Sequence, residues 1–253
     1  ERHGNVKDFL DVGCGTGQLC IEVDALGTRS VGIDFAPEMI TKCVENAQSA
    51  GSKAEFKCAS AFDASFANES FDAVSAQGFI EYITLEQLHD FLKVAHDVLR
   101  VGGVLALGNR NRLFNLLSLN DYTMMEAQLG TLGHLTEEAV LIEKAVSQED
   151  AIEQLGKFEH NYGHPVSHPE TGIKVDTRYQ YSPSELVQKL VSFGFKVECL
   201  YPVNYHAFPS ALLSDPEYKN MHLHMAASVS LHNFDVHQLL PFSSSFVVSA
   251  TRI

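Results

Sequence analysis

The sequence predicts an α/β fold built on a doubly wound, mostly parallel sheet of seven strands. Short apolar, β-rich runs alternate with helical patterns over the first 110 residues, and the same rhythm returns after residue 181. A glycine-rich turn directly follows the first apolar run. Because parallel neighbours need a crossover connection, this alternation is typical of a parallel sheet with right-handed strand–helix–strand units.

Strands are predicted where short apolar or alternating runs end at glycine or polar residues. They are expected at residues 9–12, 30–34, 54–58, 71–75, 104–107, 195–201 and 245–251. The Gly102-Gly103 pair is expected to turn the chain into the fifth of these strands.

Helices are predicted from start and stop signals as well as from apolar spacing. They are expected at residues 18–26, 37–50, 84–100 and 183–194. Thr84 and Gln87 match a capping box, in which each side chain accepts a hydrogen bond from the other's backbone. Pro183 follows Ser182, as proline does at the first position of many helices.

The middle of the chain departs from this rhythm. Residues 111–181 combine helical stretches with an acidic run and a loop rich in histidine, proline and glycine. We therefore expect a core formed by residues 1–110 and 182–253. Residues 111–181 are expected to form a mainly helical insertion that covers one end of the sheet, over the site where a substrate that accepts a transferred group would bind.

Composition narrows the class of protein. The 253 residues are 45% hydrophobic, enough for one sizeable core, and no apolar run is long enough to cross a bilayer. A formal net charge of −14 disfavours nucleic acid as a partner, because such binding depends on basic residues. The five cysteines form no C-x-x-C pair, which favours a reduced, cytoplasmic protein without a metal site.

A loop with a glycine at every second position follows the first predicted strand. It runs from Gly13 to Gly17 and precedes a helix, whose N-terminal N–H groups suit a carboxylate or a phosphate. Asp34 ends the second predicted strand, where its carboxylate can accept hydrogen bonds from ribose hydroxyls. Dinucleotides and S-adenosylmethionine both fit these features. The dinucleotide fingerprint G-x-G-x-x-G requires a third glycine where this sequence has Gln18.

Four segments in order resemble the motifs of class I S-adenosylmethionine-dependent methyltransferases, most of all the type 11 group. They are Asp-Val-Gly-Cys-Gly-Thr-Gly (11–17), Gly-Ile-Asp-Phe-Ala-Pro-Glu-Met-Ile (32–40), Ser-Phe-Asp-Ala-Val (70–74) and Leu-Arg-Val-Gly-Gly-Val-Leu (99–105). With the tail, the resemblance covers about two-thirds of the chain. It implies the Rossmann-like methyltransferase fold and S-adenosylmethionine as cofactor, with S-adenosylhomocysteine as product.

The resemblance also implies roles for individual residues. The cofactor residues would be Asp11, Gly13, Cys14, Gly15, Thr16, Gly17, Asp34, Phe35, Met39, Ser60, Ala61, Gln77 and Gly78. Asp11 would place the ammonium group, Asp34 would hold the ribose, and Phe35 and Met39 would lie against the adenine. As alternatives, Asp11 could only support the loop, and Phe35 and Met39 could belong to the core. Ser60 departs from the acid that this family often has there.

Residues after the other strands are candidates for the acceptor side. Gln77 and Gly78 would line the floor beneath the sulfonium, and Glu81 and Tyr82 follow them closely. Arg110 and Arg112 come directly after the fifth strand, where guanidinium groups suit a negatively charged acceptor. The alternative is that they pair with acids of the insertion.

Histidine is the usual general base for a hydroxyl acceptor, and this chain has 12 of them. His206 follows the sixth predicted strand and is the candidate base. His222 and His224 lie in a predicted helix, and a metal site at His160, His164 and His168 is a weaker possibility.

The sequence thus predicts methyl transfer to a small-molecule, sugar or lipid-linked acceptor, on oxygen or nitrogen rather than carbon. A nicotinamide-dependent oxidoreductase and a non-catalytic S-adenosylmethionine-binding module are the alternatives. No motif of nucleic-acid or protein-arginine methylation is present.

Overall fold

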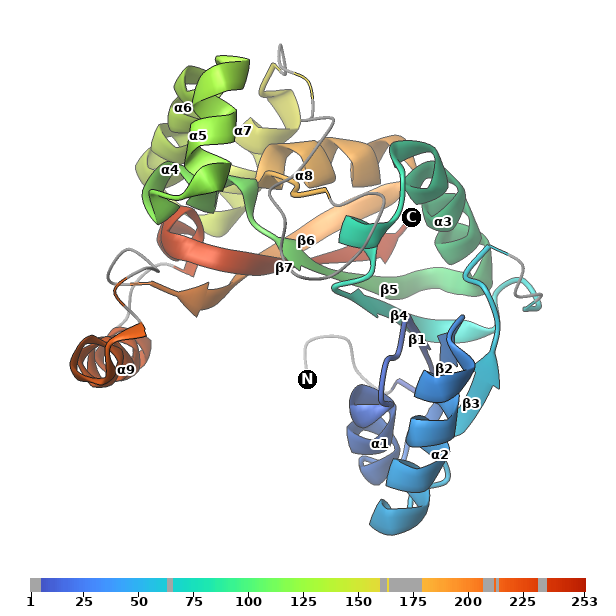
Figure 1. Cartoon of the computed structure of the whole chain (residues 1–253). Coiled ribbons are helices and arrows are strands. Elements are labelled where there is room, and N and C mark those ends of the chain that lie inside the picture. The colour runs from blue at the N-terminus through green and yellow to red at the C-terminus, as the bar shows by residue number, and fades with distance from the viewer. Residues whose placement is uncertain are drawn as a thin grey trace. The chain divides into compact units, whose positions relative to one another are not determined.

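The computed structural model describes residues 6–62, 66–159, 163, 179–206, 212, 214–231 and 236–253. These residues form two compact units. The first comprises residues 1–108, 190–197 and 249–253, and the second comprises 109–189 and 198–248. Figure 1 shows the course of the chain and the labelled elements.

Seven strands form one sheet in the order β3-β2-β1-β4-β5-β7-β6. Their bounds are β1 Asp8–Val12, β2 Arg29–Asp34, β3 Glu55–Cys58, β4 Phe71–Gln77, β5 Leu99–Arg110, β6 Phe195–Tyr205 and β7 Ser243–Arg252. The pairs β1/β2, β1/β4, β2/β3 and β4/β5 are parallel. The predicted fold class, a seven-stranded, mostly parallel sheet, is confirmed.

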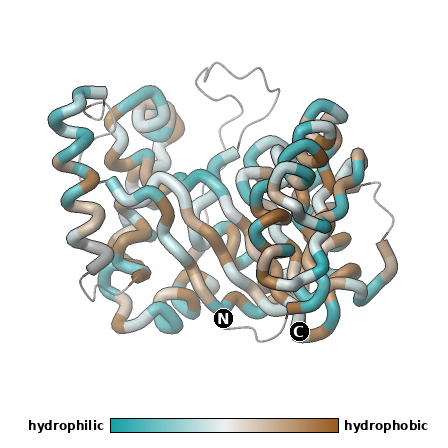
Figure 2. The backbone as a smooth tube through the Cα atoms, turned by 90° about the horizontal axis from the view of Figure 1, so that it is seen from below, coloured by the Kyte–Doolittle hydropathy of each residue, from teal (hydrophilic) through white to brown (hydrophobic). Residues whose placement is uncertain are grey.

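Helices connect these strands as predicted. In the first unit they are α1 Gln18–Ala25, α2 Pro37–Ala50 and α3 Leu85–Val98. The predicted capping box of α3 is present, since Thr84 and Gln87 exchange both hydrogen bonds. Figure 2 shows hydrophobic and hydrophilic residues interspersed along the helices, as expected of helices with one buried face.

The core of the first unit lies along β1. Phe9, Leu10 and Val12 are all buried, although neighbouring residues of a strand face opposite sides of a sheet. Both faces of β1 are therefore covered, as is usual for a central parallel strand. The chain adds β2 and β3 on one side of β1 and β4 and β5 on the other, so the strand order reverses between β1 and β4. Ligands of such sheets bind beyond the carboxyl ends of the strands at this switch point.

The fifth strand differs from its prediction. It begins at Leu99, before the Gly102-Gly103 pair, and its pairing with β4 is irregular there: Phe71 pairs with Leu99 and Ala73 with Val104. The glycines therefore lie in a bulge inside β5, not in a turn ahead of it.

The insertion after β5 is mainly helical, as predicted. Its described elements are α4 Asn115–Ser118, α5 Asp121–Leu129, α6 Leu132–Lys144 and α7 Gln148–Lys157. The helices α8 Pro183–Ser192 and α9 Pro216–Leu231 follow later in the chain. In the division into compact units, residues 182–189 and 198–248 group with residues 109–181. The predicted domain bounds remain a prediction. Among the described residues, no helix is both long and apolar enough to cross a membrane.

Candidate functional site

The glycine loop joins β1 to α1 in a shape that only glycine adopts easily. Gly13, Gly15 and Gly17 have φ angles of 70°, 53° and 78°, in the left-handed region. A Cβ atom on Gly17 would lie 2.7 Å from the Phe56 ring, whereas a Cβ on Gly15 would meet no atom of the described residues within 4 Å. The loop is thus packed against the protein at Gly17 and open at Gly15, where a ligand can approach the backbone.

Asp34 connects this loop to the end of β2. Its Oδ2 accepts the backbone N–H of Gly15 at 3.0 Å, and its Oδ1 accepts that of Ala36 at 3.0 Å. Each carboxylate oxygen can accept a further hydrogen bond. The predicted ribose contact is therefore compatible with the contacts that Asp34 makes here.

Several backbone donors beside the loop have no acceptor among the described residues. α1 begins after Gly17 without a side-chain cap. Within the described part of the chain, the N–H groups of Thr16, Gln18 and Leu19 have no acceptor. Together with the positive end of the helix dipole, they favour an anion at this point.

Asp11 lies beneath the loop in β1, directly opposite Ser75 of β4. It is buried, and a hydrogen bond joins its carboxyl group to Ser75, whose hydroxyl also accepts from the Gln77 side chain at 3.1 Å. Burial raises the pKa of Asp11 to about 7, with the Ser75 bond opposing this rise and the charge of Asp34 adding to it. A buried carboxyl group of this kind gains most from a nearby cation, such as an ammonium group.

Two apolar side chains beyond β2 are exposed. Phe35 is 78% exposed and Met39 is 42% exposed. Neither is a core residue, so the alternative of plain core packing does not hold for them. Ser60 accepts the N–H of Phe62 through its hydroxyl, and Ala61 is buried. The adenine contacts expected of these residues remain predictions.

The end of β4 carries the residues predicted to lie beneath the sulfonium. Gln77 donates to the Ala106 carbonyl at 3.3 Å, and Gly78 donates its N–H to Gly108 at 2.9 Å. Glu81 is buried and Tyr82 is 37% exposed, both in a short 3-10 helix. The floor of the site is thus tied to β5, and its predicted role in cofactor binding remains untested.

Residues 9–103 match the family model described as "Methyltransferase domain". This part of the chain is thus similar to a methyltransferase domain, as the resemblance to class I S-adenosylmethionine-dependent methyltransferases predicts. The matched range contains the glycine loop, Asp34 and the end of β4. S-adenosylmethionine is the cofactor of this family.

Two curated relatives of the chain carry the same name. The "Ubiquinone biosynthesis O-methyltransferase" of Azorhizobium caulinodans is 30% identical over 111 residues, which cover 44% of this chain and 43% of the relative. That of Parvibaculum lavamentivorans is 31% identical over 104 residues, covering 41% and 40%. The match therefore spans less than half the length of these relatives.

Solved structures share the fold over nearly the whole chain. A SAM-dependent methyltransferase from Methanosarcina mazei is 20% identical, with a TM-score of 0.63 and coverage of 100% of this chain and 95% of that one. Magnesium protoporphyrin IX methyltransferase from Synechocystis, solved with bound SAH, is 12% identical, with a TM-score of 0.51 and coverage of 97% and 73%. At these identities the likeness shows the fold.

Arg112, predicted to contact an acceptor, is a buried ion-pair residue. It is 1% exposed, and its Nε and Nη2 donate to the two carboxylate oxygens of Glu126 at 2.9 and 3.0 Å. Glu185 and the Gly163 carbonyl accept from the same guanidinium at 3.3 and 3.1 Å. Burial alone would raise the pKa of Glu126, but hydrogen bonds and charge from Arg112 hold it below its ordinary value. This geometry matches the alternative of pairing with internal acids.

Arg110 ends β5 and is half-buried. Its predicted contact with a negatively charged acceptor remains untested. His160, His164 and His168 lie outside the described residues.

His206 follows β6 and lies among aromatic rings. Its ring centroid is 4.6 Å from that of Phe114 and 5.5 Å from that of His222, and its backbone N–H donates to Phe242. Burial lowers the pKa of His206, and the neighbouring His222 lowers it further. The imidazole is therefore neutral near pH 7, the state that a general base requires.

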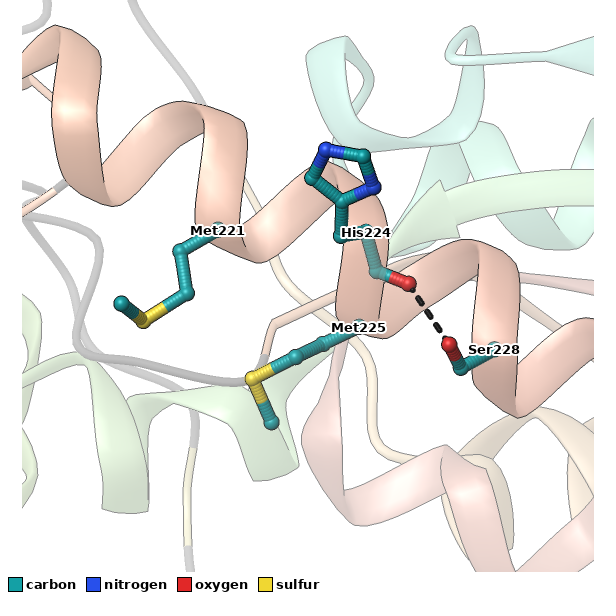
Figure 3. Close-up of a pocket in the computed structure, with 4 residues that line it drawn as sticks. All are labelled: Met221, His224, Met225 and Ser228. Atoms are coloured by element: carbon teal, nitrogen blue, oxygen red, sulfur yellow. Dashed lines mark hydrogen bonds between the residues drawn. The ribbon is translucent and has the colours of Figure 1, made fainter.

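A cavity of about 500 Å³ lies against α9 in the second unit. Met221, His224, Met225 and Ser228 line it, and no residue of the glycine loop does. Figure 3 shows both thioether side chains reaching to one side of the helix, while the Ser228 hydroxyl donates to the His224 carbonyl.

Sequence reasoning missed the residues that support the loop. Ser75 holds Asp11, and Phe56 packs beneath Gly17. Cys43 and Asn46 of α2 donate to the carbonyls of Gly15 and Thr16. Their side chains belong to no motif, and only the strand register and the helix packing bring them to the loop.

Proposed function

We propose that the chain transfers the methyl group of S-adenosylmethionine to a hydroxyl oxygen of a small-molecule acceptor. The observation that carries this proposal is the Asp34–Gly15 contact beside backbone donors of the loop and α1 that find no acceptor in the described part of the chain. A ribose acceptor at the end of β2 is thus bonded to the loop that carries the anion site, as a nucleoside with an amino-acid tail requires. The names of the curated relatives, O-methyltransferases of ubiquinone biosynthesis, support oxygen as the methylated atom.

The residues present fit this cofactor. Bound S-adenosylmethionine supplies a methyl group that its positive sulfur has already activated. The backbone N–H of Thr16 would hold the cofactor's carboxylate, and Asp11 would hold its ammonium group. Asp34 would accept the ribose hydroxyls, and the exposed side chains of Phe35 and Met39 would cover the adenine.

For an O-methylation, the protein has to align the acceptor hydroxyl and remove its proton. His206 is the proposed base, because its neutral imidazole can take that proton. Arg110 is the proposed contact for a negatively charged group on the acceptor. The net charge of −14 disfavours nucleic acid, and sugar or lipid-linked acceptors are alternatives to a free small molecule. A cytoplasmic location also remains a prediction.

A methyl-transfer assay tests this function. Purified protein is incubated with methyl-labelled S-adenosylmethionine and with hydroxylated aromatic compounds, including intermediates of ubiquinone biosynthesis, and products are identified by mass spectrometry. Amine and sugar panels run in parallel, with an Asp34→Ala variant as the control. A labelled methyl ether that the wild type forms and the Asp34→Ala variant does not form supports the proposal. Labelled product only in the amine panel, or in none, overturns it.

A further inference from the structure

Two side chains of α2 hold the carbonyl groups of the glycine loop. The Cys43 thiol donates to the Gly15 carbonyl, with Sγ and O 3.1 Å apart. The Asn46 side-chain amide donates to the Thr16 carbonyl at 3.0 Å. Cys43 and Asn46, here called the α2 pair, are three residues apart and therefore share one face of the helix.

These contacts fix the direction of the loop's N–H groups. In a planar trans peptide, the C=O and N–H groups point in opposite directions. Because the Gly15 carbonyl points to α2, the N–H of Thr16 points away from α2. That N–H has no acceptor within the described residues. In the next peptide the N–H of Gly17 is already used, since it donates to Cys14 at 2.9 Å.

The opposite side of the loop is held by a different element. Asp34, at the end of β2, accepts the N–H of Gly15 at 3.0 Å. The peptides on either side of Gly15 are thus each fixed through one polar group. Without such contacts, glycine could rotate these peptides, because both signs of φ are accessible to it.

Burial favours the donor role of Cys43. Its side chain is fully buried, and its Sγ lies 3.9 Å from that of Cys14. Burial raises the pKa of the Cys43 thiol, so the thiol keeps its proton near pH 7. A protonated thiol can donate to a carbonyl, whereas a thiolate would repel it.

We infer that the α2 pair consists of positioning residues for the carboxylate of S-adenosylmethionine. Cys43 aims the Thr16 N–H at it by holding the Gly15 carbonyl, and Asn46 holds the next peptide, whose N–H donates to Cys14. The inference rests on the proposed function, since it assigns the supports of the same cofactor site. Neither residue touches the cofactor in this account.

Variants of Asn46 separate positioning from structural support. Asn46→Ala removes the donor and replaces asparagine by a better helix former, so the melting temperature should not fall. S-adenosylhomocysteine binding, measured by calorimetry, should nevertheless weaken about two- to tenfold, the effect of one hydrogen bond. Asn46→Asp should weaken binding further, because a carboxylate repels the Thr16 carbonyl. Cys43→Ser keeps a donor and should bind more tightly than Cys43→Ala.

Gln48→Ala is the matched control, since Gln48 lies on the exposed face of α2. It should bind S-adenosylhomocysteine as the wild type does. In turnover, the variants of Asn46 should raise KM for S-adenosylmethionine with kcat unchanged. Wild-type affinity in both Asn46 variants would overturn this inference alone. No binding by the wild type would overturn the proposed function, and this inference with it.

Discussion

The Asp34 carboxylate accepts the backbone N–H of Gly15 at 3.0 Å, and so joins the end of β2 to the glycine loop after β1. The residue expected to hold the ribose also fixes the loop that is expected to hold the amino-acid part. Loss of this carboxylate should therefore disturb the binding of both the ribose and the amino-acid part of the cofactor.

Asp34→Asn is predicted to weaken S-adenosylhomocysteine binding at least about tenfold, because an amide cannot accept from both Gly15 and Ala36. Calorimetry checks this. Asp24→Asn is the control, since the Asp24 carboxylate also accepts a backbone N–H, from Lys53 at 2.8 Å, at the end of α1 remote from the loop. Equal losses of affinity in the two variants would contradict a specific role for Asp34.

The glycines of the loop should respond differently to a methyl group. Gly17→Ala places a Cβ 2.7 Å from the Phe56 ring, so it should unfold at lower temperature than the wild type and bind cofactor poorly. The Cβ of Gly15→Ala meets no described atom within 4 Å, so this variant should cost only about 1–2 kcal/mol for its positive φ. It should still impair cofactor binding, because its Cβ occupies the open side of the loop. Thermal unfolding and calorimetry distinguish these effects, and equal melting temperatures for the two variants would refute the packing argument.

Asp11 should make stability depend on pH. The folded protein holds this proton up to about pH 7, whereas the unfolded chain releases it near its ordinary pKa. Between these values the folded state binds more protons, so stability falls as pH rises. From about pH 5 to about pH 8 the contribution lost is about 2.5 kcal/mol.

Asp11→Asn should remove this contribution to the pH dependence of the unfolding free energy. Urea unfolding at about pH 5 and at about pH 8 measures it. The comparison needs this variant because burial also raises the pKa of Glu138 to about 7, which adds a slope of the same sign. Identical slopes in wild type and variant would show that Asp11 is ionised throughout.

Arg112→Ala should destabilise the protein by about 3–5 kcal/mol, because the buried Glu126 carboxylate loses its partner. Arg110→Ala should instead raise the acceptor KM with little loss of stability. Urea unfolding measures the stability of both variants, and steady-state kinetics measures their KM for the acceptor. If the acceptor KM changed only in Arg112→Ala and the stability of that variant were unchanged, Arg112 and not Arg110 would be the residue that contacts the acceptor.

His206 should appear in the pH profile of methyl transfer. Because the pKa of His206 is lowered, activity should fall only when the pH drops below about 6.5, the ordinary pKa of histidine. Above about pH 7 the rate should be constant. His206→Gln should reduce kcat by about 10²–10⁴-fold and abolish the acidic limb. An unchanged profile in this variant would exclude His206 as the base.

Local sequence signals accounted for most of the elements. α2 coincides with its predicted span because Pro37 starts it and Gly51, with a φ of 65°, ends it. Thr84 and Gln87 fixed the start of α3 in the same way. The pattern was insufficient at Gly102-Gly103, because glycine serves bulges as well as turns, and only the pairing with β4 decides between them.

Long-range contacts were the part that the sequence could not supply. Glu126 lies 14 residues from Arg112 and Glu185 lies 73, so nothing local indicated a buried pair. Cys43 and Asn46 reach the loop only because α2 packs beside it. The motif residues of the cofactor site could be predicted, whereas their supports depend on the folded arrangement.

Calorimetric titration of the wild-type protein with S-adenosylhomocysteine and, separately, with NAD⁺ tests the central claim most directly. We expect one site for S-adenosylhomocysteine with micromolar or tighter affinity, and no heat of binding with NAD⁺. Binding of NAD⁺ in its place, or of neither compound, would contradict it.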